Sequence, residues 1–333
     1  MSVLPKAAFI DDNPPAIFRA FDEKTIASLK EIVDISDRVY TRDDLSELAD
    51  VEYLFSTWGM LTLNEEEIAR YLPKAKAVFY AAGSVQHFAR PFLNRGIAVH
   101  SAWSANGVPV AEVAYSEIML ANKGFFQCPR KFREQGKPVA AAYHLAFPGN
   151  YNVCVGILGA GMIGSMVAKK LSANDVRVKV FDPFASDEHI AEIGAERASL
   201  DEIFSTCQTI SCHIANNERT KGMLTYELFS KMLPNATFIN TGRGAQLIEA
   251  DLVRALTECP DRTAVLDVTF PEPPQEGHPF YSLPNVYLTP HLAGSSANEI
   301  ARMGAYMYSE CAAYLKGEPT KWGVTLKMLE TLA

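Results

Sequence analysis

The sequence of 333 residues lacks the features of several protein classes. It contains no apolar run near the roughly 20 residues that a membrane-spanning helix needs. Its formal net charge of −8 argues against a general nucleic-acid surface and against an anionic membrane surface. No internal repeat and no low-complexity tract is present. We therefore expect a globular protein whose partners are small molecules, with no nucleic acid and no membrane among them.

Cysteine is scarce, and the six cysteines include no C-x-x-C pair. In a chain of this length we expect them to be reduced and mostly buried as small apolar side chains. Cys207, Cys212 and His213 lie close together in the sequence. Two of these residues fall on a predicted strand and no second pair of ligands is near, so we expect no metal site.

The length of the chain favours about two domains. Near the N-terminus a short apolar run soon meets Asp11 and Asp12, which indicates a first strand and not a signal peptide. No partner-binding tail or extended linker is evident at either end. These features predict a cytoplasmic protein.

The most informative segment contains the pattern G-x-G-x-x-G, formed by Gly159, Gly161 and Gly164. The apolar run 153–158 before it is typical of a strand that is buried on both faces. Apolar residues at helical spacing follow over 162–174, and a second apolar run over 176–181 ends at Asp182. This order of strand, glycine turn, helix, strand and acid is typical of a dinucleotide-binding βαβ unit.

Each glycine of this pattern has a physical role. Gly159 permits the tight turn, Gly161 lets the backbone approach a pyrophosphate, and Gly164 lets helix and strand pack closely. The backbone N–H groups near Met162 and Ile163 open the helix, where the helix dipole favours negative charge.

Asp182 would accept hydrogen bonds from the ribose hydroxyls and would repel a 2′-phosphate, which favours NAD over NADP. The alternative is a glycine-rich turn in an α/β protein that binds nothing.

Strands and helices alternate along the rest of the chain, which predicts parallel sheets. In the first hundred residues we predict strands at 7–11, 51–57, 77–81 and 97–100, and helices at 25–33, 65–72 and 85–94. Residues 101–109 are predicted to form a polar connection and a hinge, and residues 110–121 a helix. Residues 123–150 are less regular and predict a helix with an extended surface segment. After Asp182 we predict strands at 209–213, 237–241, 262–268 and 286–289, and helices at 200–207, 225–233, 246–258 and 295–315.

Polar residues gather where the strands of the second half end. Open parallel sheets bind ligands outside the carboxyl ends of their strands. These predicted ends carry Asp182, His213, Arg243, Asp267 and His291, and Glu272 follows in the next loop. Such a concentration at one edge predicts a functional site there.

Three of these residues suit acid–base chemistry on a carboxylic acid. Arg243 lies between two glycines, and its planar fork suits a carboxylate. His291 can exchange a proton near neutral pH, and Glu272 could orient its ring and stabilise its charged form. Taken singly, each has a simpler interpretation: a surface arginine on a turn, a structural histidine and an exposed loop glutamate.

At this point the sequence resembles the D-isomer-specific 2-hydroxyacid dehydrogenases, the family of phosphoglycerate, D-lactate, glyoxylate and formate dehydrogenases. The resemblance covers most of the chain and is strongest over 103–296. Its motifs are Asn106 with 110–112, the glycine pattern with Asp182, 213–220, 240–244, 266–268, 272–273, 283–286 and 288–294.

The resemblance implies roles for the matching positions. Arg243 would bind the substrate carboxylate and polarise the carbonyl group. His291 would be the acid in reduction and the base in oxidation, with Glu272 as its hydrogen-bond partner. Asp267 would contact the nicotinamide carboxamide. The residues implied to line the cofactor cleft are His213, Ile214, Thr220 and Thr241.

The resemblance also implies a fold and an assembly. It predicts two doubly wound parallel-sheet domains of the α/β class, with a Rossmann NAD-binding domain (102–294) inserted into a smaller flavodoxin-like substrate domain (1–101 and 295–333). Cleft closure would then exclude water during catalysis. A homodimer is expected.

Two departures from the family pattern alter the predicted pocket walls. The substrate loop, which implies carboxylate binding by the backbone of Gly83, Ser84 and Val85, lacks the family's second glycine and acid. The family's H-x-P-x-T string is replaced by the residues 213–217.

The sequence therefore leads to two alternative hypotheses about function. The first is an NAD-dependent oxidoreductase that transfers a hydride between NAD(H) and C2 of a D-2-hydroxy acid or 2-oxo acid. The second is an NAD-sensing binding protein of the corepressor type on the same fold. The sequence does not single out one acid, one direction or a form of regulation.

Overall fold

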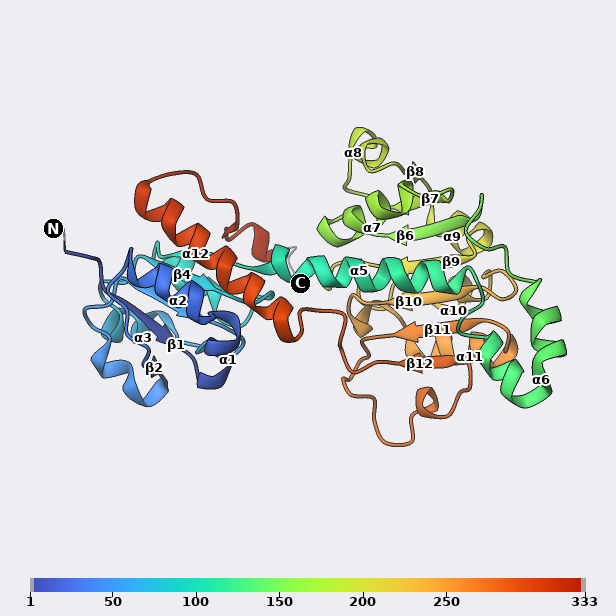
Figure 1. Ribbon diagram of the computed structural model, residues 1–333, viewed down its shortest axis with the longest axis horizontal. Helices are drawn as coiled ribbons and strands as arrows, with labels where there is room; N and C mark the ends of the chain where they lie inside the picture. The colour runs from blue at the N-terminus through green and yellow to red at the C-terminus, as the bar shows by residue number, and fades with distance from the viewer. Residues whose placement is uncertain (1–2, 331–333) are drawn as a thin grey trace. The chain divides into compact units, whose positions relative to one another are not determined.

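The computed structural model describes residues 3–330 and separates into two compact units (Figure 1). Unit 1 holds the residues up to Gly107 and those from Ser295 onward, and unit 2 is Val108–Gly294. The outermost residues of the sequence-based substrate domain, 1–2 and 331–333, lie outside the described residues. That unit 1 binds substrate stays a prediction.

Unit 1 contains one six-stranded sheet in the order β13-β5-β4-β3-β1-β2. All of its pairs are parallel except that of β13 with β5. Without β13 this is the 2-1-3-4-5 order of flavodoxin-like sheets. The strands are β1 (Ala7–Ile10), β2 (Val39–Tyr40), β3 (Tyr53–Ser56), β4 (Ala77–Tyr80), β5 (Ala98–Ser101) and β13 (Gly323–Val324).

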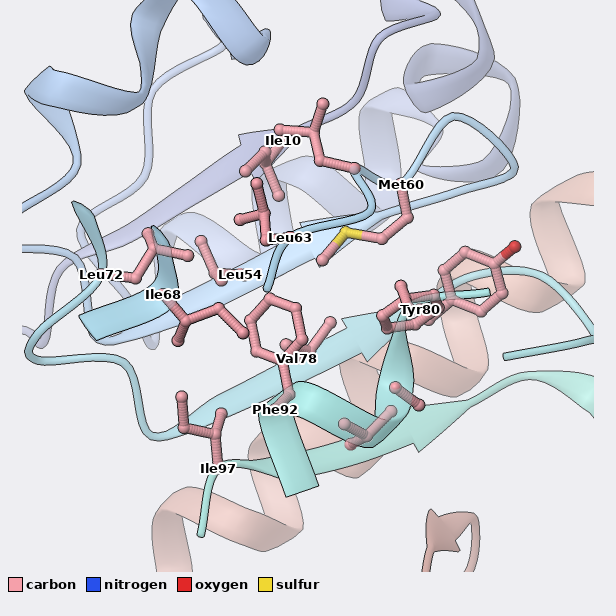
Figure 2. Packing of buried hydrophobic residues seen from close by; sticks show 14 of the residues in the cluster. Ile10, Leu54, Met60, Leu63, Ile68, Leu72, Val78, Tyr80, Phe92 and Ile97 are labelled. Carbon is pink, nitrogen blue, oxygen red and sulfur yellow. The ribbon is translucent and has the colours of Figure 1, made fainter. Parts of the chain in front are cut away.

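Helices cover both faces of this sheet. The α-helices are α1 (Pro14–Ala20), α2 (Glu23–Lys30), α3 (Glu65–Tyr71), α4 (Ala89–Asn94) and α12 (Ile300–Lys316), and the 3-10 helices are η1 (Arg42–Glu47), η4 (Ala297–Glu299) and η5 (Met328–Glu330). One apolar core packs α3 and α4 on the sheet and includes Leu54, Ile68, Val78 and Phe92 (Figure 2). The other packs α1, α2 and α12 on the opposite face. Asn64 caps α3 by accepting a hydrogen bond from the Glu67 backbone N–H.

Unit 2 contains a seven-stranded parallel sheet in the order β12-β11-β10-β9-β6-β7-β8. Numbered within the unit, its first six strands have the 3-2-1-4-5-6 order of the Rossmann fold, which confirms the predicted fold class. The strands are β6 (Cys154–Leu158), β7 (Arg177–Phe181), β8 (Glu196–Arg197), β9 (Thr209–Cys212), β10 (Thr237–Asn240), β11 (Thr263–Leu266) and β12 (Val286–Leu288).

Two helical layers enclose this second sheet. The core that contains Val155, Ile157 and Val265 packs α5 (Trp103–Ala121), α7 (Met162–Ser172) and α8 (Asp187–Glu192) on one face. The core that contains Phe204, Phe229 and Phe238 packs α9 (Leu200–Thr206), α10 (Tyr226–Phe229) and α11 (Glu249–Glu258) on the other. The remaining helices are α6 (Cys128–His144), η2 (Gly244–Gln246) and η3 (Pro279–Tyr281).

The prediction for residues 101–109 is wrong. The polar connection expected at 101–109 is helical from Trp103, and α5 continues through Pro109. Tertiary packing outweighs the weak local signal, because Ala105, Val110 and Ala111 are all buried. The chain therefore passes from one unit to the other inside a single helix.

Candidate functional site

The glycine pattern lies between β6 and α7, at the place where the order of the seven-stranded sheet reverses. Gly159 has φ +96°, and a Cβ there would lie 2.8 Å from the carbonyl oxygen of His213. A Cβ on Gly164 would overlap the carbonyl oxygen of Gly159. A Cβ on Gly161 would meet no described atom within 4 Å. The fold itself therefore requires two of the glycines, whereas the third leaves open space at the start of α7, as a bound pyrophosphate requires.

Asp182 follows β7 and is tied to this glycine turn. Its Oδ2 accepts a hydrogen bond of 2.7 Å from the Ala160 backbone N–H. Its Oδ1 accepts bonds from the N–H groups of Phe184 (2.8 Å) and Ala185 (3.0 Å). These bonds fix a carboxylate beside the turn, at the carboxyl edge of the sheet. Met162 and Ile163 are the first two residues of α7, as predicted.

His213 follows β9 and lies next to the glycine turn. Its Nε2 lies 2.9 Å from Ser211 Oγ, and burial lowers its pKa to about 4, so the ring is neutral at neutral pH. Six buried side-chain polar atoms in unit 2 lack a hydrogen-bond partner among the described residues, and two of them, His213 Nδ1 and Thr241 Oγ1, belong to residues predicted to line the cofactor cleft. Buried polar groups normally find partners, so these two atoms suit a polar ligand.

Two other residues predicted to line the cofactor cleft belong to a closed loop. The Thr220 hydroxyl donates to the carbonyl oxygens of Ala215 (2.6 Å) and Asn217 (3.0 Å). The Ile214 carbonyl oxygen accepts a bond of 2.8 Å from Gln246 Nε2. Their observed contacts therefore stabilise the loop after β9.

The loop that carries Arg243 is held by two amide side chains. Asn240 Oδ1 accepts from the Gly242 N–H (3.0 Å), and its Nδ2 donates to the Arg243 carbonyl oxygen (2.8 Å). Gln246 Oε1 accepts from the Arg243 N–H (3.1 Å). Burial lowers the pKa of the Arg243 guanidinium, and the negative charge of Glu272 opposes that shift. A cation is thus fixed near the Glu272 carboxylate.

Asp267 fixes the loop that carries His291. Its Oδ1 accepts from Thr289 Oγ1 (2.6 Å) and from the Leu292 N–H (2.8 Å), and its Oδ2 accepts from the Ala293 N–H (3.0 Å). His291 has φ +55°, a left-handed conformation that is uncommon for residues other than glycine. The carboxylate therefore anchors the backbone on both sides of an unusual residue.

His291 and Glu272 form a direct pair. His291 Nδ1 lies 2.7 Å from Glu272 Oε1, and about two fifths or more of each side chain is exposed (46% and 40%). Since Nδ1 faces the carboxylate, Nε2 is the ring nitrogen that remains for another proton partner. The structure thus brings together the histidine and the glutamate that the sequence had proposed as an acid–base pair.

The predicted substrate loop belongs to unit 1, after β4. Its Val85 side chain is buried, and the Ser101 hydroxyl donates to the carbonyl oxygens of Ala82 (2.9 Å) and Gly83 (2.7 Å). A Cβ on Gly83 would meet Asn106 Nδ2 at 3.6 Å, an ordinary contact. The backbone just before Ser84 is therefore held by Ser101 of β5.

Comparison with known proteins identifies the family. The family model described as "D-isomer specific 2-hydroxyacid dehydrogenase, NAD binding domain" matches residues 116–293. The chain belongs to this family. Its cofactor is NAD, and the open space at Gly161 and the unpaired atoms of His213 and Thr241 fit such a ligand.

Individual members of the 2-hydroxyacid dehydrogenase family match over most of the chain. YoaD of Bacillus subtilis, whose name assigns it to the 2-hydroxyacid dehydrogenases, is 29% identical over 96% of this chain and 92% of its own length. The D-3-phosphoglycerate dehydrogenase of Archaeoglobus fulgidus is 29% identical over 71% of this chain, which spans only 44% of that protein. The NAD-complexed D-isomer specific 2-hydroxyacid dehydrogenase of Lactobacillus delbrueckii ssp. bulgaricus superposes with a TM-score of 0.77 at 19% identity, over 96% of this chain and all of that one.

Sequence reasoning missed one ionisable residue of this chain. Glu117, on α5, has a buried Oε2 without a partner among the described residues. Burial raises its pKa to about 7, and the negative charge of Asp267 adds to the shift. Helical periodicity could have revealed it, because Glu117 lies three residues from Ala114 and next to Ile118, which are both buried.

Residues 3–330 contain neither a membrane-spanning helix nor a cluster of metal-ligating side chains. None of the helices in 3–330 is long and apolar enough to cross a membrane. Within the same range, no group of three or more His, Cys, Asp and Glu side chains could hold a metal ion.

Proposed function

We propose that this protein is an NAD-dependent dehydrogenase that interconverts a D-2-hydroxy acid and the corresponding 2-oxo acid. The observation that carries the proposal is the pair formed by His291 and Glu272, whose Nδ1 and Oε1 atoms lie 2.7 Å apart. The negative charge of Glu272 also acts on the Arg243 guanidinium. A histidine oriented by a carboxylate is an effective general acid and base. The cation beside it suits the carboxylate of the substrate.

Each of the three side chains has its own role in the proposed reaction. NAD, when bound, supplies the acceptor or donor of the hydride at C2. In reduction, His291 Nε2 gives its proton to the carbonyl oxygen of the substrate, and Glu272 stabilises the imidazolium that precedes this transfer. In oxidation, the same nitrogen takes the hydroxyl proton. Arg243 holds the substrate carboxylate and polarises the carbonyl group, where negative charge develops in the transition state.

Other residues of unit 2 would hold the cofactor. The first N–H groups of α7, at Met162 and Ile163, would bind the pyrophosphate over Gly161, and Asp182 would accept hydrogen bonds from the ribose. His213, Ile214, Thr220 and Thr241 are proposed to line the rest of the cleft. We also propose that Asp267 contacts the nicotinamide carboxamide. Its observed hydrogen bonds are those with the loop of His291.

The proposed substrate is a small 2-oxo acid or 2-hydroxy acid. Arg243 supplies one cation for the carboxylate, and the backbone of Gly83, Ser84 and Val85 stays a sequence-based prediction for the same group. The side chain at C3 and beyond would determine which acid is preferred.

We further propose that the protein is a homodimer that buries an exposed apolar groove of unit 2. The groove has a volume of about 640 Å³ and lies between the end of α5 and α6. Phe125 and Phe132, which line it, are more than half exposed (54% and 53%), and contiguous apolar surface of this kind marks association sites. In multi-angle light scattering we expect a dimeric mass that Phe132→Glu reduces to that of a monomer, whereas Phe184→Glu, a change at an exposed phenylalanine outside the groove, does not. A monomeric wild type would refute this proposal.

Turnover with a panel of acids tests the enzymatic function. Purified protein would be mixed with NADH and glyoxylate, pyruvate, hydroxypyruvate, 2-oxoisocaproate or phenylpyruvate, and the oxidation of NADH would be followed, with NADPH in parallel. We expect turnover with NADH on at least one acid and a D-configured product. Tight NADH binding without turnover on any acid of a broader panel would favour the sensor alternative instead.

A further inference from the structure

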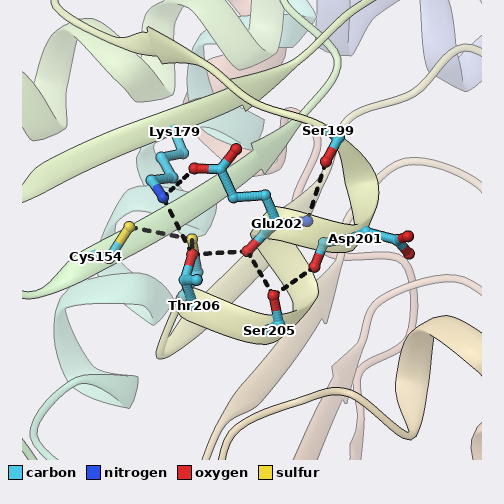
Figure 3. Close-up of polar contacts among 8 residues, drawn as sticks. Cys154, Lys179, Ser199, Asp201, Glu202, Ser205 and Thr206 are labelled. Atoms are coloured by element: carbon cyan, nitrogen blue, oxygen red, sulfur yellow. Dashed lines mark hydrogen bonds and ion pairs between the residues drawn. The ribbon is translucent and has the colours of Figure 1, made fainter.

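A pair of buried cysteines lies in unit 2, at the end of the sheet opposite to the candidate active site. Cys154 is the first residue of β6, and Cys207 follows the last residue of α9. Their side chains are 6% and 0% exposed, and their Sγ atoms lie 3.2 Å apart (Figure 3). The glycine turn begins at the other end of β6, about 13 Å along the strand at 3.3 Å per residue.

The backbone already holds the two cysteines in place. The Gln208 N–H donates to the Cys154 carbonyl oxygen (2.9 Å), and the Cys207 N–H donates to the Ile203 carbonyl oxygen (3.0 Å). Gly156 lets α9 pack closely on β6, because a Cβ there would lie 2.3 Å from Ile203 Cγ2, whereas Cys207 Sγ would be 3.4 Å away, an ordinary contact. The sulfur atoms therefore need to approach each other by only about 1 Å to reach the length of a disulfide bond.

The surroundings give the two thiols different chemistry. The hydrogen bond with Cys207 and the positive charges of Lys179 and Arg177 lower the pKa of Cys154. The same hydrogen bond and burial raise the pKa of Cys207. Lys179 belongs to β7, and its Nζ donates hydrogen bonds to Glu202 and to Thr206 Oγ1 of α9 (Figure 3). Cys154 is also the less buried of the two side chains (6% against 0% exposed). We therefore take Cys154 as the thiol that becomes the thiolate, the reactive form of cysteine.

We propose that Cys154 and Cys207 form an oxidisable dithiol that hydrogen peroxide converts to a disulfide. The Cys154 thiolate attacks one peroxide oxygen, the O–O bond breaks, and the leaving hydroxide takes a proton to become water. Cys207 Sγ then attacks the sulfenic sulfur of Cys154. The S–O bond breaks, and the departing oxygen leaves as a second water with the Cys207 proton. Two thiols lose two electrons in total, and one peroxide is reduced to two waters.

The disulfide would join segments that are far apart in the chain. Cys154 and Cys207 are 53 positions apart, so the bond would restrict a long loop of the unfolded chain and stabilise unit 2. We expect the oxidised protein to unfold at a higher temperature than the reduced protein, and dithiothreitol to reverse the shift.

Peptide mapping of the wild-type protein is the decisive test. Protein treated with a small excess of peroxide is denatured, alkylated and digested without reductant. We expect a linked pair of peptides that contain Cys154 and Cys207, with the loss of two hydrogen atoms, and alkylated thiols at Cys212 and Cys311, which are also buried. Free thiols at Cys154 and Cys207, under conditions that oxidise the more accessible Cys128 and Cys259, would overturn the proposal.

Single variants separate the two roles. In Cys207→Ser, the sulfenic acid of Cys154 cannot be resolved, so dimedone should label Cys154. In Cys154→Ser, Cys207 should stay unlabelled. Cys212→Ser is the matched control for a buried cysteine of the same sheet and should form the disulfide as the wild type does. Equal labelling of Cys154 and Cys207 would contradict the assigned roles.

Discussion

The pKa of Glu117 depends on its burial and on the charge of a neighbouring residue. Burial and Asp267 raise its pKa to about 7, above the ordinary value of a glutamate. Between pH 4.5 and 7 the folded state therefore binds more protons than the unfolded state, and stability falls as the pH rises through this window. At pH 8 the ionised carboxylate destabilises the fold by roughly 3 kcal/mol.

We therefore expect Glu117→Gln to raise the free energy of unfolding at pH 8 and to have little effect at pH 5. Urea denaturation of the cofactor-free protein at both values would measure the difference. Glu112→Gln, at an exposed position of the same helix, is the matched control and should change stability little at either pH. An equal effect of Glu117→Gln at pH 5 and pH 8 would show that the carboxyl group does not titrate in this window.

The Glu272 carboxylate should affect the pH dependence of the proposed reaction. An amide cannot stabilise the imidazolium as a carboxylate does, so Glu272→Gln should move the alkaline limb of the reductive pH profile to lower pH. The pH dependence of kcat/KM measures this shift. Glu276→Gln, at an exposed position in the same loop, should leave the profile unchanged, and an unaltered profile in Glu272→Gln would refute the functional pairing.

At the residue scale, the sequence predicted which polar groups lie at the carboxyl edge of the sheet, because each follows an apolar strand. It did not reveal the bonds that hold them. Asp267 was assigned to the cofactor alone, whereas it also fixes the loop of His291 through one hydroxyl and two backbone N–H groups. These hydrogen-bond partners depend on how strands β11 and β12 lie next to each other, and no local sequence pattern predicts that arrangement.

In the strand–turn–helix element β6–α7, one glycine is needed for folding and another for cofactor binding. A Cβ on Gly164 would overlap the Gly159 carbonyl oxygen, so Gly164→Ala should destabilise the protein by about 1–3 kcal/mol. A Cβ on Gly161 would enter open space and block only the cofactor. Gly161→Ala should therefore keep the melting temperature within a few degrees and weaken NADH binding strongly.

Differential scanning fluorimetry and a fluorescence titration with NADH would measure these two effects. Gly277→Ala, at a loop glycine in open space with a φ of +77°, is a control for the loss of glycine and should not affect NADH affinity. A Gly161→Ala variant that binds NADH as tightly as the wild type would contradict the proposed place of the pyrophosphate.

At the element scale, the predicted bounds were accurate in the βαβ unit around the glycine pattern, where apolar runs and helical spacing follow each other directly. Helix α7 and strand β7 lie within two residues of their predicted bounds. For α9 the Ser199 hydroxyl accepts a hydrogen bond from the Glu202 N–H, and the Glu202 side chain bonds Lys179 and not the Ser199 backbone. Pro109 and Gly107 concealed the start of α5, because its stability comes from burial in both units.

At the scale of the whole molecule, the alternation of strands and helices predicted two parallel sheets, and the structure confirms them. The order of the strands depends on crossovers between segments that the alternation alone does not fix. That order decides which loops meet: the reversal between β6 and β9 puts the glycine turn next to His213. The antiparallel edge strand β13, two residues long, had no usable signal in the sequence.

The central claim is that His291, paired with Glu272, moves the substrate proton. The most direct measurement compares kcat/KM of His291→Ala and His278→Ala with that of the wild type, on the acid that the panel identifies. His278 is the matched control, since its Nε2 also pairs with a carboxylate, Glu249 at 3.3 Å, elsewhere in unit 2. We predict that His291→Ala lowers kcat/KM by about 10²- to 10⁴-fold and that His278→Ala changes it little. Near-normal turnover in His291→Ala, with NADH still bound, would contradict the account.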